Sequence, residues 1–159
     1  MQIKPFQNSK YINSSELGKK ISGEQLIFVS GCFDIIHFGH LYFFRKAKEL
    51  APNAKLLVVT HDDDSISMKK GMNRPVNKLE DRVELLCELE SVDYVSSWIG
   101  WESIQDLVRD LKPAYLAVTN GEFSQKNVEK VVEEIGAKLL VIDKIDGAST
   151  SKIIEKVGF

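Results

Sequence analysis

Five short apolar runs alternate with amphipathic stretches along this chain. Residues 26–29 (Leu-Ile-Phe-Val) form the first run, which is bounded by Gly23 on one side and Gly31 on the other. Short apolar runs between turn-forming residues are typical of buried strands. We therefore expect strands at residues 26–29, 55–60, 94–97, 114–118 and 138–142.

Apolar residues at helical spacing separate these runs. Leu41, Phe44 and Leu50 follow the first run at intervals of three and six residues, which is the pattern of a helix with one buried face. Residues 13–16 (Asn-Ser-Ser-Glu) have the spacing of a capping box and predict a short helix that runs through Lys20. Further helices are expected at residues 78–90, 104–111, 128–135 and 153–157.

Strands that alternate with helices favour right-handed βαβ units and a sheet covered on both faces. The chain is therefore predicted to be an α/β protein, a Rossmann-like three-layer α/β/α sandwich with a five-stranded parallel sheet. No repeat or linker divides the sequence, so we expect a single domain over residues 1–159 with an N-terminal helical extension at residues 1–22. Ligands of such sheets bind beyond the carboxyl ends of the strands. The segments to inspect are residues 30–40, 61–82, 119–125 and 144–152.

Composition narrows the classes of function. The 159 residues carry a net charge of −2, which gives no basic field for nucleic acid. No apolar run approaches the ~20 residues of a membrane span, and residues 1–10 lack the core of a signal peptide, so we expect a cytoplasmic location with no membrane partner. Cys32 and Cys87 are too few for a disulfide framework or structural zinc site, and Cys87 is expected to be a buried thiol.

The segment between the first strand and its helix, residues 31–40, carries the candidate chemistry. His37 and His40 are separated by two residues, one of which is Gly39, where the helix is expected to begin. The free N–H groups and positive dipole end of a helix N-terminus favour phosphate, and two imidazoles can donate to the same anion. Gly31 permits close approach of a ligand to the backbone. The segment is thus a predicted phosphate site.

The motifs of the chain resemble those of one superfamily. Residues 31–40 match the G-x-F-D-x-x-H-x-G-H signature of the cytidylyltransferase-like nucleotidyltransferases. Residues 74–77 (Arg-Pro-Val-Asn), 79–82 (Leu-Glu-Asp-Arg) and 90–95 (Glu-Ser-Val-Asp-Tyr-Val) resemble one branch, the D-glycero-β-D-manno-heptose 1-phosphate adenylyltransferases. Residues 147–151 (Gly-Ala-Ser-Thr-Ser) are similar to the I-S-T-T/S motif of the superfamily.

The resemblance implies transfer of a nucleoside monophosphate from ATP or CTP to a phosphorylated small-molecule acceptor, by in-line attack on the α-phosphorus with release of pyrophosphate. It implies Mg²⁺ as companion of the triphosphate, no metal site on the protein, and a homodimer. The implied catalytic residues are His37, His40, Lys70 and Arg82. The implied nucleotide-binding residues are Gly31, Cys32, Phe33, Asp34, Gly39, Ser149, Thr150 and Ser151. The implied substrate-binding residues are Asp63, Arg74, Asn77, Asn120, Gly121 and Glu122.

Several of these residues also have plainer interpretations. Arg82 follows two acidic residues, and such an arginine usually forms an exposed ion pair. The cationic residues of segment 69–74 lie in a polar stretch whose composition is typical of a solvated loop, and residues 149–151 satisfy the needs of a simple N-cap. Residues 61–64 (His-Asp-Asp-Asp) suggest either a metal site or a solvated acidic loop end.

The segment after the fourth strand departs from the heptose branch. That branch carries K-G-G/A-D-Y where acceptor and nucleotide are held, whereas residues 117–123 here read Ala-Val-Thr-Asn-Gly-Glu-Phe, without the lysine and with Glu122 for the aspartate. Ser67 also replaces the first lysine of the K-x-x-K-G phosphate loop, although Lys70 and Gly71 match its end. An acceptor site that lacks a cation is expected to hold a sugar phosphate differently or to bind another kind of acceptor.

Three functions therefore stay open. The first is adenylyl transfer to heptose 1-phosphate or a similar sugar phosphate. The second is cytidylyl transfer to a polyol phosphate such as glycerol 3-phosphate, or an FAD synthetase-like adenylyl transfer. The third is a nucleotide-binding regulatory protein without turnover. Residues 101–102 (Trp-Glu) are similar to the glycerol phosphate branch, and Trp98 and Trp101 are expected in the core, the acceptor pocket or a dimer contact.

Overall fold

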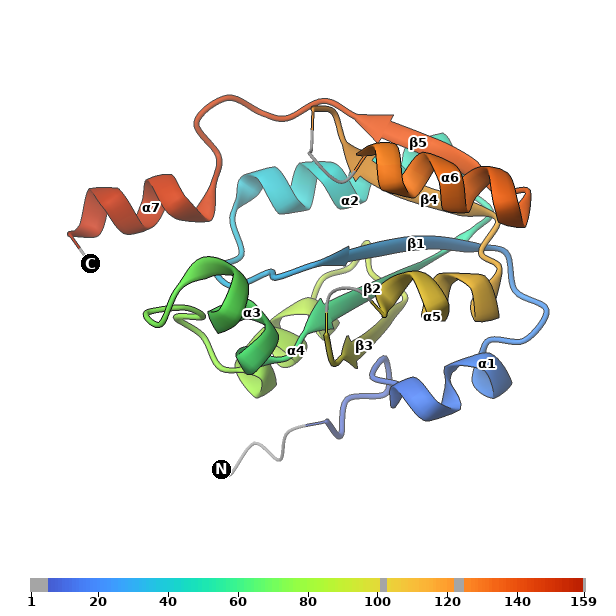
Figure 1. The fold of residues 1–159 in the computed structure, drawn as a ribbon, viewed down its shortest axis with the longest axis horizontal. Coiled ribbons are helices and arrows are strands. Elements are labelled where there is room, and N and C mark those ends of the chain that lie inside the picture. Colours follow the sequence, from blue (N-terminus) through green and yellow to red (C-terminus); the bar gives the residue numbers. More distant parts are fainter. Residues whose placement is uncertain (1–5, 101–102, 122–124, 159) are drawn as a thin grey trace.

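Five parallel strands form the centre of the fold (Figure 1). The computed structural model describes residues 6–100, 103–121 and 125–158. The strands lie in the order β3-β2-β1-β4-β5, and every pairing is parallel. Each predicted strand is present, with ends that shift by at most two residues. Their bounds are Leu26–Gly31 (β1), Lys55–His61 (β2), Tyr94–Trp98 (β3), Tyr115–Thr119 (β4) and Lys138–Ile142 (β5).

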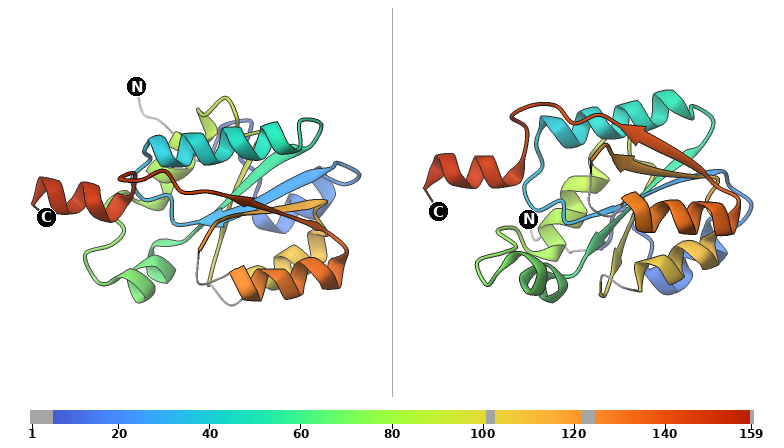
Figure 2. Two further views of the ribbon diagram at one scale, coloured as in Figure 1. Left: turned by 90° about the horizontal axis from the view of Figure 1, so that it is seen from above. Right: turned by 45° about the horizontal axis from the view of Figure 1, so that its top comes forward.

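Helices cover both faces of the sheet (Figure 2). The alternation of side chains along β1 sends Ile27 and Val29 into one core and Leu26 and Phe28 into the other, and all four are buried. The predicted three-layer Rossmann-like sandwich is therefore confirmed. The first face is covered by α2 (Phe38–Leu50) and α4 (Leu79–Cys87), and the second by α1 (Leu17–Lys20), α5 (Ile104–Leu111) and α6 (Gln125–Ile135).

The N-terminal segment packs onto this sandwich. The backbone N–H of Ile12 donates to the carbonyl of Val95 over 2.9 Å, so the segment extends the sheet edge beside β3. A short helical turn, η1 (Ser14–Glu16), begins where the side chain of Asn13 accepts a backbone hydrogen bond, as the capping pattern predicts. Leu17 then buries its side chain completely in the second core. The assignment of a single domain with an N-terminal extension stays a prediction.

Helix α3 (Asp63–Lys70) lies where composition predicts a polar loop. Only Ser65 and Ile66 are buried in it, so no apolar stripe marks it in the sequence. Two acidic residues stand in its first turn and two lysines in its last, which complements the helix dipole at both ends. Interactions of these charges with the helix dipole thus stabilise α3, whereas the burial of apolar side chains stabilises it little. Helix α4 is also shorter than the predicted 78–90.

Helix α7 (Thr150–Val157) lies beyond the carboxyl ends of the strands, at one end of the molecule (Figure 1). Its N-terminus, rather than its side, faces the sheet edge where a ligand is expected. Within the described ranges, no helix combines the length and apolar character needed to cross a bilayer.

Cys87 and Trp98 both lie against the packed layers of the fold. Cys87 is 2% exposed, which confirms the predicted buried thiol, and burial raises its pKa to about 12. Trp98 packs partly buried against the second core, and its indole N–H donates to Ser103 Oγ over 2.9 Å. Trp101 lies outside the described residues.

Candidate active site

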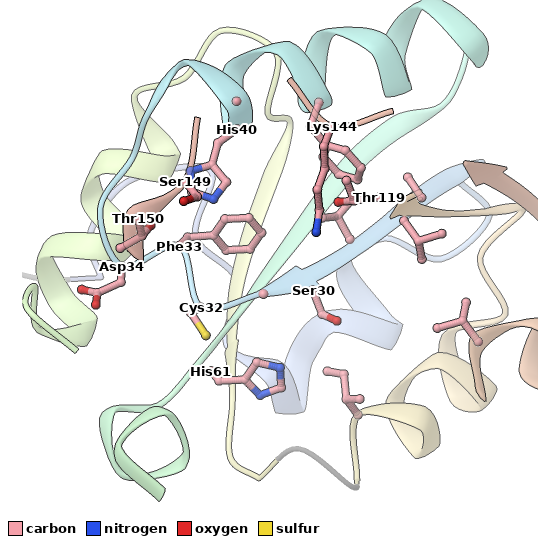
Figure 3. Close-up of a pocket in the computed structure, with 18 of the residues that line it drawn as sticks. Ser30, Cys32, Phe33, Asp34, His40, His61, Thr119, Lys144, Ser149 and Thr150 are labelled. Atoms are coloured by element: carbon pink, nitrogen blue, oxygen red, sulfur yellow. The ribbon is translucent and has the colours of Figure 1, made fainter. Parts of the chain in front are cut away.

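A cavity of about 890 Å³ opens beyond the carboxyl ends of β1 and β4 (Figure 3). These neighbouring strands form the point where the strand order reverses, which is where open α/β sheets bind ligands. Most of the predicted site residues come together there. Those that line the cavity are Gly31, Cys32, Phe33, Asp34, His37, Gly39, His40, Lys70, Arg74, Gly121, Ser149, Thr150 and Ser151.

The two histidines of the motif stack at the start of α2. His37 is the N-cap residue, and its ring centroid lies 3.8 Å from that of His40 with 25° between the planes. Burial, followed by the proximity of His37, lowers the pKa of His40 to about 4, and burial also lowers the pKa of His37. Both rings are therefore neutral at pH 7, so each has one N–H to donate and one nitrogen that accepts. Within the described part of the chain, neither buried Nδ1 has a hydrogen-bond partner.

The glycines of the motif allow close packing around these rings. A Cβ on Gly39 would lie 3.0 Å from the His37 ring and 3.1 Å from Cβ of Ala148. A Cβ on Gly31 would come within 2.9 Å of the ring of Phe33. Phe33 itself adopts a left-handed φ of 47°, which turns the chain sharply after β1 and places its ring against His40. A side chain at either position would therefore require the neighbouring side chains to shift, independently of any ligand.

The N-terminus of α7 faces the same cavity. Ser149 is its N-cap, and its hydroxyl accepts from the backbone N–H of Lys152 over 3.2 Å. The Thr150 hydroxyl donates to the carbonyl of Ile35 over 3.3 Å, which ties this helix to the loop that precedes His37. Two helix N-termini, those of α2 and α7, therefore border one cavity, and both favour an anion there.

Asp34 organises the loop of residues 74–77, which lies beside the start of α7 (Figure 3). Its carboxylate is 1% exposed and accepts the backbone N–H groups of Val76 and Asn77 over 2.8 and 2.9 Å. It also pairs with Nε of Arg74, and the Asn77 amide donates to the Asp34 carbonyl. The three residues that the resemblance assigns to nucleotide and substrate thus bind one another, which fixes the course of residues 74–77.

Arg82 is the largest fully buried side chain among the described residues. Each of its five N–H groups meets a protein acceptor: the carbonyls of Cys32, His61 and Asn77, the Thr60 hydroxyl and the carboxylate of Asp63. The plainer expectation of an exposed ion pair is wrong, because only the partner Asp63 is exposed. The side chain does not line the cavity; it ties α4 to the ends of β1 and β2.

The sequence of the chain matches that of a known family over most of this fold. The profile of the cytidylyltransferase-like family covers residues 28–156, from β1 into α7. The chain belongs to the cytidylyltransferase-like family.

Relatives of this cytidylyltransferase-like chain agree with the assignment. It is 38% identical over 158 residues to the bifunctional protein HldE of Helicobacter hepaticus, of which it spans 32%. The chain thus corresponds to about a third of the curated relatives it matches. Among solved structures, a lipopolysaccharide core biosynthesis protein of Thermoplasma volcanium shares the fold with a TM-score of 0.61 at 22% identity, over 77% of this chain and 98% of that one. Pantothenate synthetase of Thermus thermophilus shares it with a TM-score of 0.60 at 17% identity, over 84% and 60%.

Several residues that line the cavity are absent from the residues predicted for the site. Those labelled in Figure 3 are Ser30, His61, Thr119 and Lys144. His61 ends β2 and is fully buried, so the expectation of a solvated loop end is wrong for it. Burial lowers its pKa to about 4, an effect that the backbone of Gly100 partly offsets. The sequence places Ser30, His61, Thr119 and Lys144 at or just after the ends of predicted strands. It does not show that their side chains point into one cavity.

The remaining predicted residues lie beside the cavity or outside the described ranges. Asn120 donates to the carboxylate of Asp143 over 2.8 Å, next to Gly121 at the cavity edge. Glu122 lies outside the described residues. In the described ranges, no three His, Cys, Asp or Glu side chains gather in a way that would hold a metal ion.

Proposed function

We propose that this domain is a nucleotidyltransferase that moves AMP from ATP onto a sugar phosphate such as heptose 1-phosphate and releases pyrophosphate. The observation that carries the proposal is the stacked pair of neutral histidines, His37 and His40, at a helix N-terminus inside a cavity at the strand switch point. Such a site offers hydrogen-bond donors to a phosphate without a protein nucleophile, which suits group transfer between two bound phosphates.

The two helix N-termini suggest how the triphosphate is held. The α2 N-terminus with its histidines would contact the α-phosphate, where negative charge gathers on the equatorial oxygens as the acceptor attacks. The α7 N-terminus at Ser149 and Ser151, together with Lys70 at the end of α3, would hold the departing pyrophosphate. Mg²⁺ bound to the phosphates would supply further charge neutralisation. Catalysis would then rest on orientation and electrostatics rather than on covalent chemistry.

Asp34, Asp63, Asn77 and Arg82 act in this proposal as positioning residues. Arg82 fixes the carbonyl of Cys32, one residue beyond β1, and therefore the path of the phosphate loop. Asp34 fixes residues 74–77. It also pairs with the side chain of Arg74, which lines the cavity. Direct contact with the triphosphate is thus assigned to groups that the cavity exposes, rather than to every residue that the motifs contain.

The sugar phosphate acceptor is supported by the relatives. Residues 74–77 and 90–95 resemble the heptose phosphate branch, and the chain is 38% identical to a bifunctional protein HldE. The proposal also includes a homodimer, which light scattering after gel filtration would test, and a cytoplasmic location, which cell fractionation would test.

The proposal is tested by measuring pyrophosphate release with ATP, CTP, GTP and UTP against a panel of phosphorylated acceptors. We expect turnover with ATP and a sugar 1-phosphate, and none when the acceptor lacks its phosphate. Preference for CTP with glycerol 3-phosphate would replace the proposal by a cytidylyltransferase. Tight ATP binding without turnover on any acceptor would indicate a regulatory nucleotide-binding protein.

A further inference from the structure

The end of the cavity beside β4 and β5 carries a cationic side chain that belongs to none of the sequence motifs described above. Lys144 lines the cavity two residues beyond the end of β5 (Figure 3). Ile142 of β5 pairs with Thr119 of β4, and its carbonyl accepts from the backbone N–H of Asn120 over 2.8 Å. The register of the two strands therefore sets Lys144 beside the end of β4, where the sequence lacks the lysine of the heptose branch.

The charges around the cavity are unevenly placed. Its other lysine and arginine residues, Lys69, Lys70 and Arg74, come from the end of α3 and the loop that follows it. Among the described residues, Lys144 is the one lysine or arginine that lines the cavity on the β4–β5 side. It takes part in no ion pair with another described residue. The neighbouring carboxylate of Asp143 accepts a hydrogen bond from Asn120.

The direction of the reaction assigns a role to this cation. In Figure 3, His40 lies between Ser149 and Thr150 on one side and Lys144 on the other. In-line transfer needs the attacking oxygen opposite the leaving pyrophosphate. If pyrophosphate departs toward α7, the acceptor must approach from the side of β4 and β5.

We propose that Lys144 binds the phosphate of the acceptor, as the cation that replaces the lysine missing from the end of β4. This inference rests on the proposed function and narrows its substrate class to acceptors that bring their own phosphate to the β4–β5 side of His40. The ammonium group of a lysine contacts phosphate as a point charge on a flexible stem, so it can reach the position from a neighbouring strand. The acceptor site then keeps a cation although its position in the sequence has changed.

The test compares Michaelis constants for the two substrates. In Lys144→Ala, the KM for the sugar phosphate should rise about 10- to 100-fold, as expected for loss of a charge-assisted contact, while the KM for ATP stays within about twofold. Lys144→Arg should retain most of the affinity, and adding Thr119→Lys to Lys144→Ala should restore it in part. Lys138→Ala is the matched control, because it removes one positive charge from the opposite end of β5.

Two results would overturn the inference while the proposed function stands. One is an equal rise in the KM for ATP and for the acceptor; the other is the same change in Lys138→Ala as in Lys144→Ala. If the wild-type domain turns over no acceptor, the proposed function fails, and calorimetry with glucose 1-phosphate in the presence of a non-hydrolysable ATP analogue decides the inference separately. Binding that weakens at least tenfold in Lys144→Ala supports it. Equal binding, or no binding to the wild type, refutes it.

Discussion

Arg82 Nη1 donates to the carbonyl of Cys32 over 2.8 Å, and this bond joins α4 to the loop that begins the phosphate site. Because the guanidinium is fully buried and all five of its N–H groups are used, its removal leaves several buried acceptors unpaired. We expect Arg82→Ala to lower the free energy of unfolding by about 3–5 kcal/mol without nucleotide. Urea unfolding would measure this loss.

The control for Arg82 is Arg109→Ala. Arg109 pairs with Glu134 and Asp106 on the surface, so its loss should lower the free energy of unfolding far less than the loss of Arg82 does. If Arg82 served only to bind phosphate, Arg82→Ala would keep wild-type stability and change only the KM for ATP. That outcome would exclude the positioning role.

The strands and the histidine pair could be predicted because their signals are local. An apolar run such as residues 138–142 is recognisable without its partners, and its predicted bounds are those of β5. The burial of Arg82 could not be predicted, because its acceptors come from β2 and from the segments that follow β1 and β2. The place of Lys144 depends likewise on the register between β4 and β5. Helix α3 was missed because its single buried apolar residue, Ile66, gives no periodic pattern.

Asp34 should contribute stability through the loop that it holds. In Asp34→Asn, the carboxylate that pairs with Arg74 and accepts from Val76 and Asn77 loses its charge, so we expect a loss of about 3 kcal/mol in the free energy of unfolding. Asp106→Asn is the control, since Asp106 is 73% exposed, and its change should stay within about 0.5 kcal/mol. Equal losses in the two variants would show that Asp34 does not fix residues 74–77.

His40 is expected to be essential for turnover but not for folding. His40→Ala removes a donor that faces the reacting phosphate in our proposal, so kcat should fall at least about 100-fold. Circular dichroism should give the wild-type spectrum, and Lys46→Ala, on the same helix but exposed, should keep the wild-type rate. A His40→Ala enzyme with wild-type turnover would rule out the assignment of the site.

The two buried histidines predict how stability depends on pH. The pKa values of His40 and His61 are lowered to about 4 by burial, whereas both would have ordinary values near 6.5 in the unfolded chain. Between pH 6.5 and 4 the unfolded state takes up protons that the folded state excludes. The free energy of unfolding should therefore fall with falling pH, by up to about 1.4 kcal/mol per pH unit for each histidine. Urea unfolding at pH 7, 6 and 5 measures the slope.

A variant separates the two contributions. His61→Asn removes one of the titrating groups, so its unfolding free energy should change less steeply between pH 6.5 and 5 than that of the wild type. A wild-type stability that is constant over this window would show that the imidazoles are protonated as readily in the folded state as in the unfolded one.

Gly39 sets the distance between the His37 ring and the segment before α7. A Cβ at this position would lie 3.0 Å from the ring and 3.1 Å from Cβ of Ala148, so Gly39→Ala must displace one of them. Because both border the site, we expect kcat/KM to fall about 10- to 100-fold with little change in melting temperature. Gly18→Ala is the control: a Cβ there meets nothing within 4 Å, and alanine favours the helix, so activity should be unchanged and stability slightly higher. If Gly39→Ala retains full activity, a few tenths of an ångström between the two helix N-termini do not matter to the reaction.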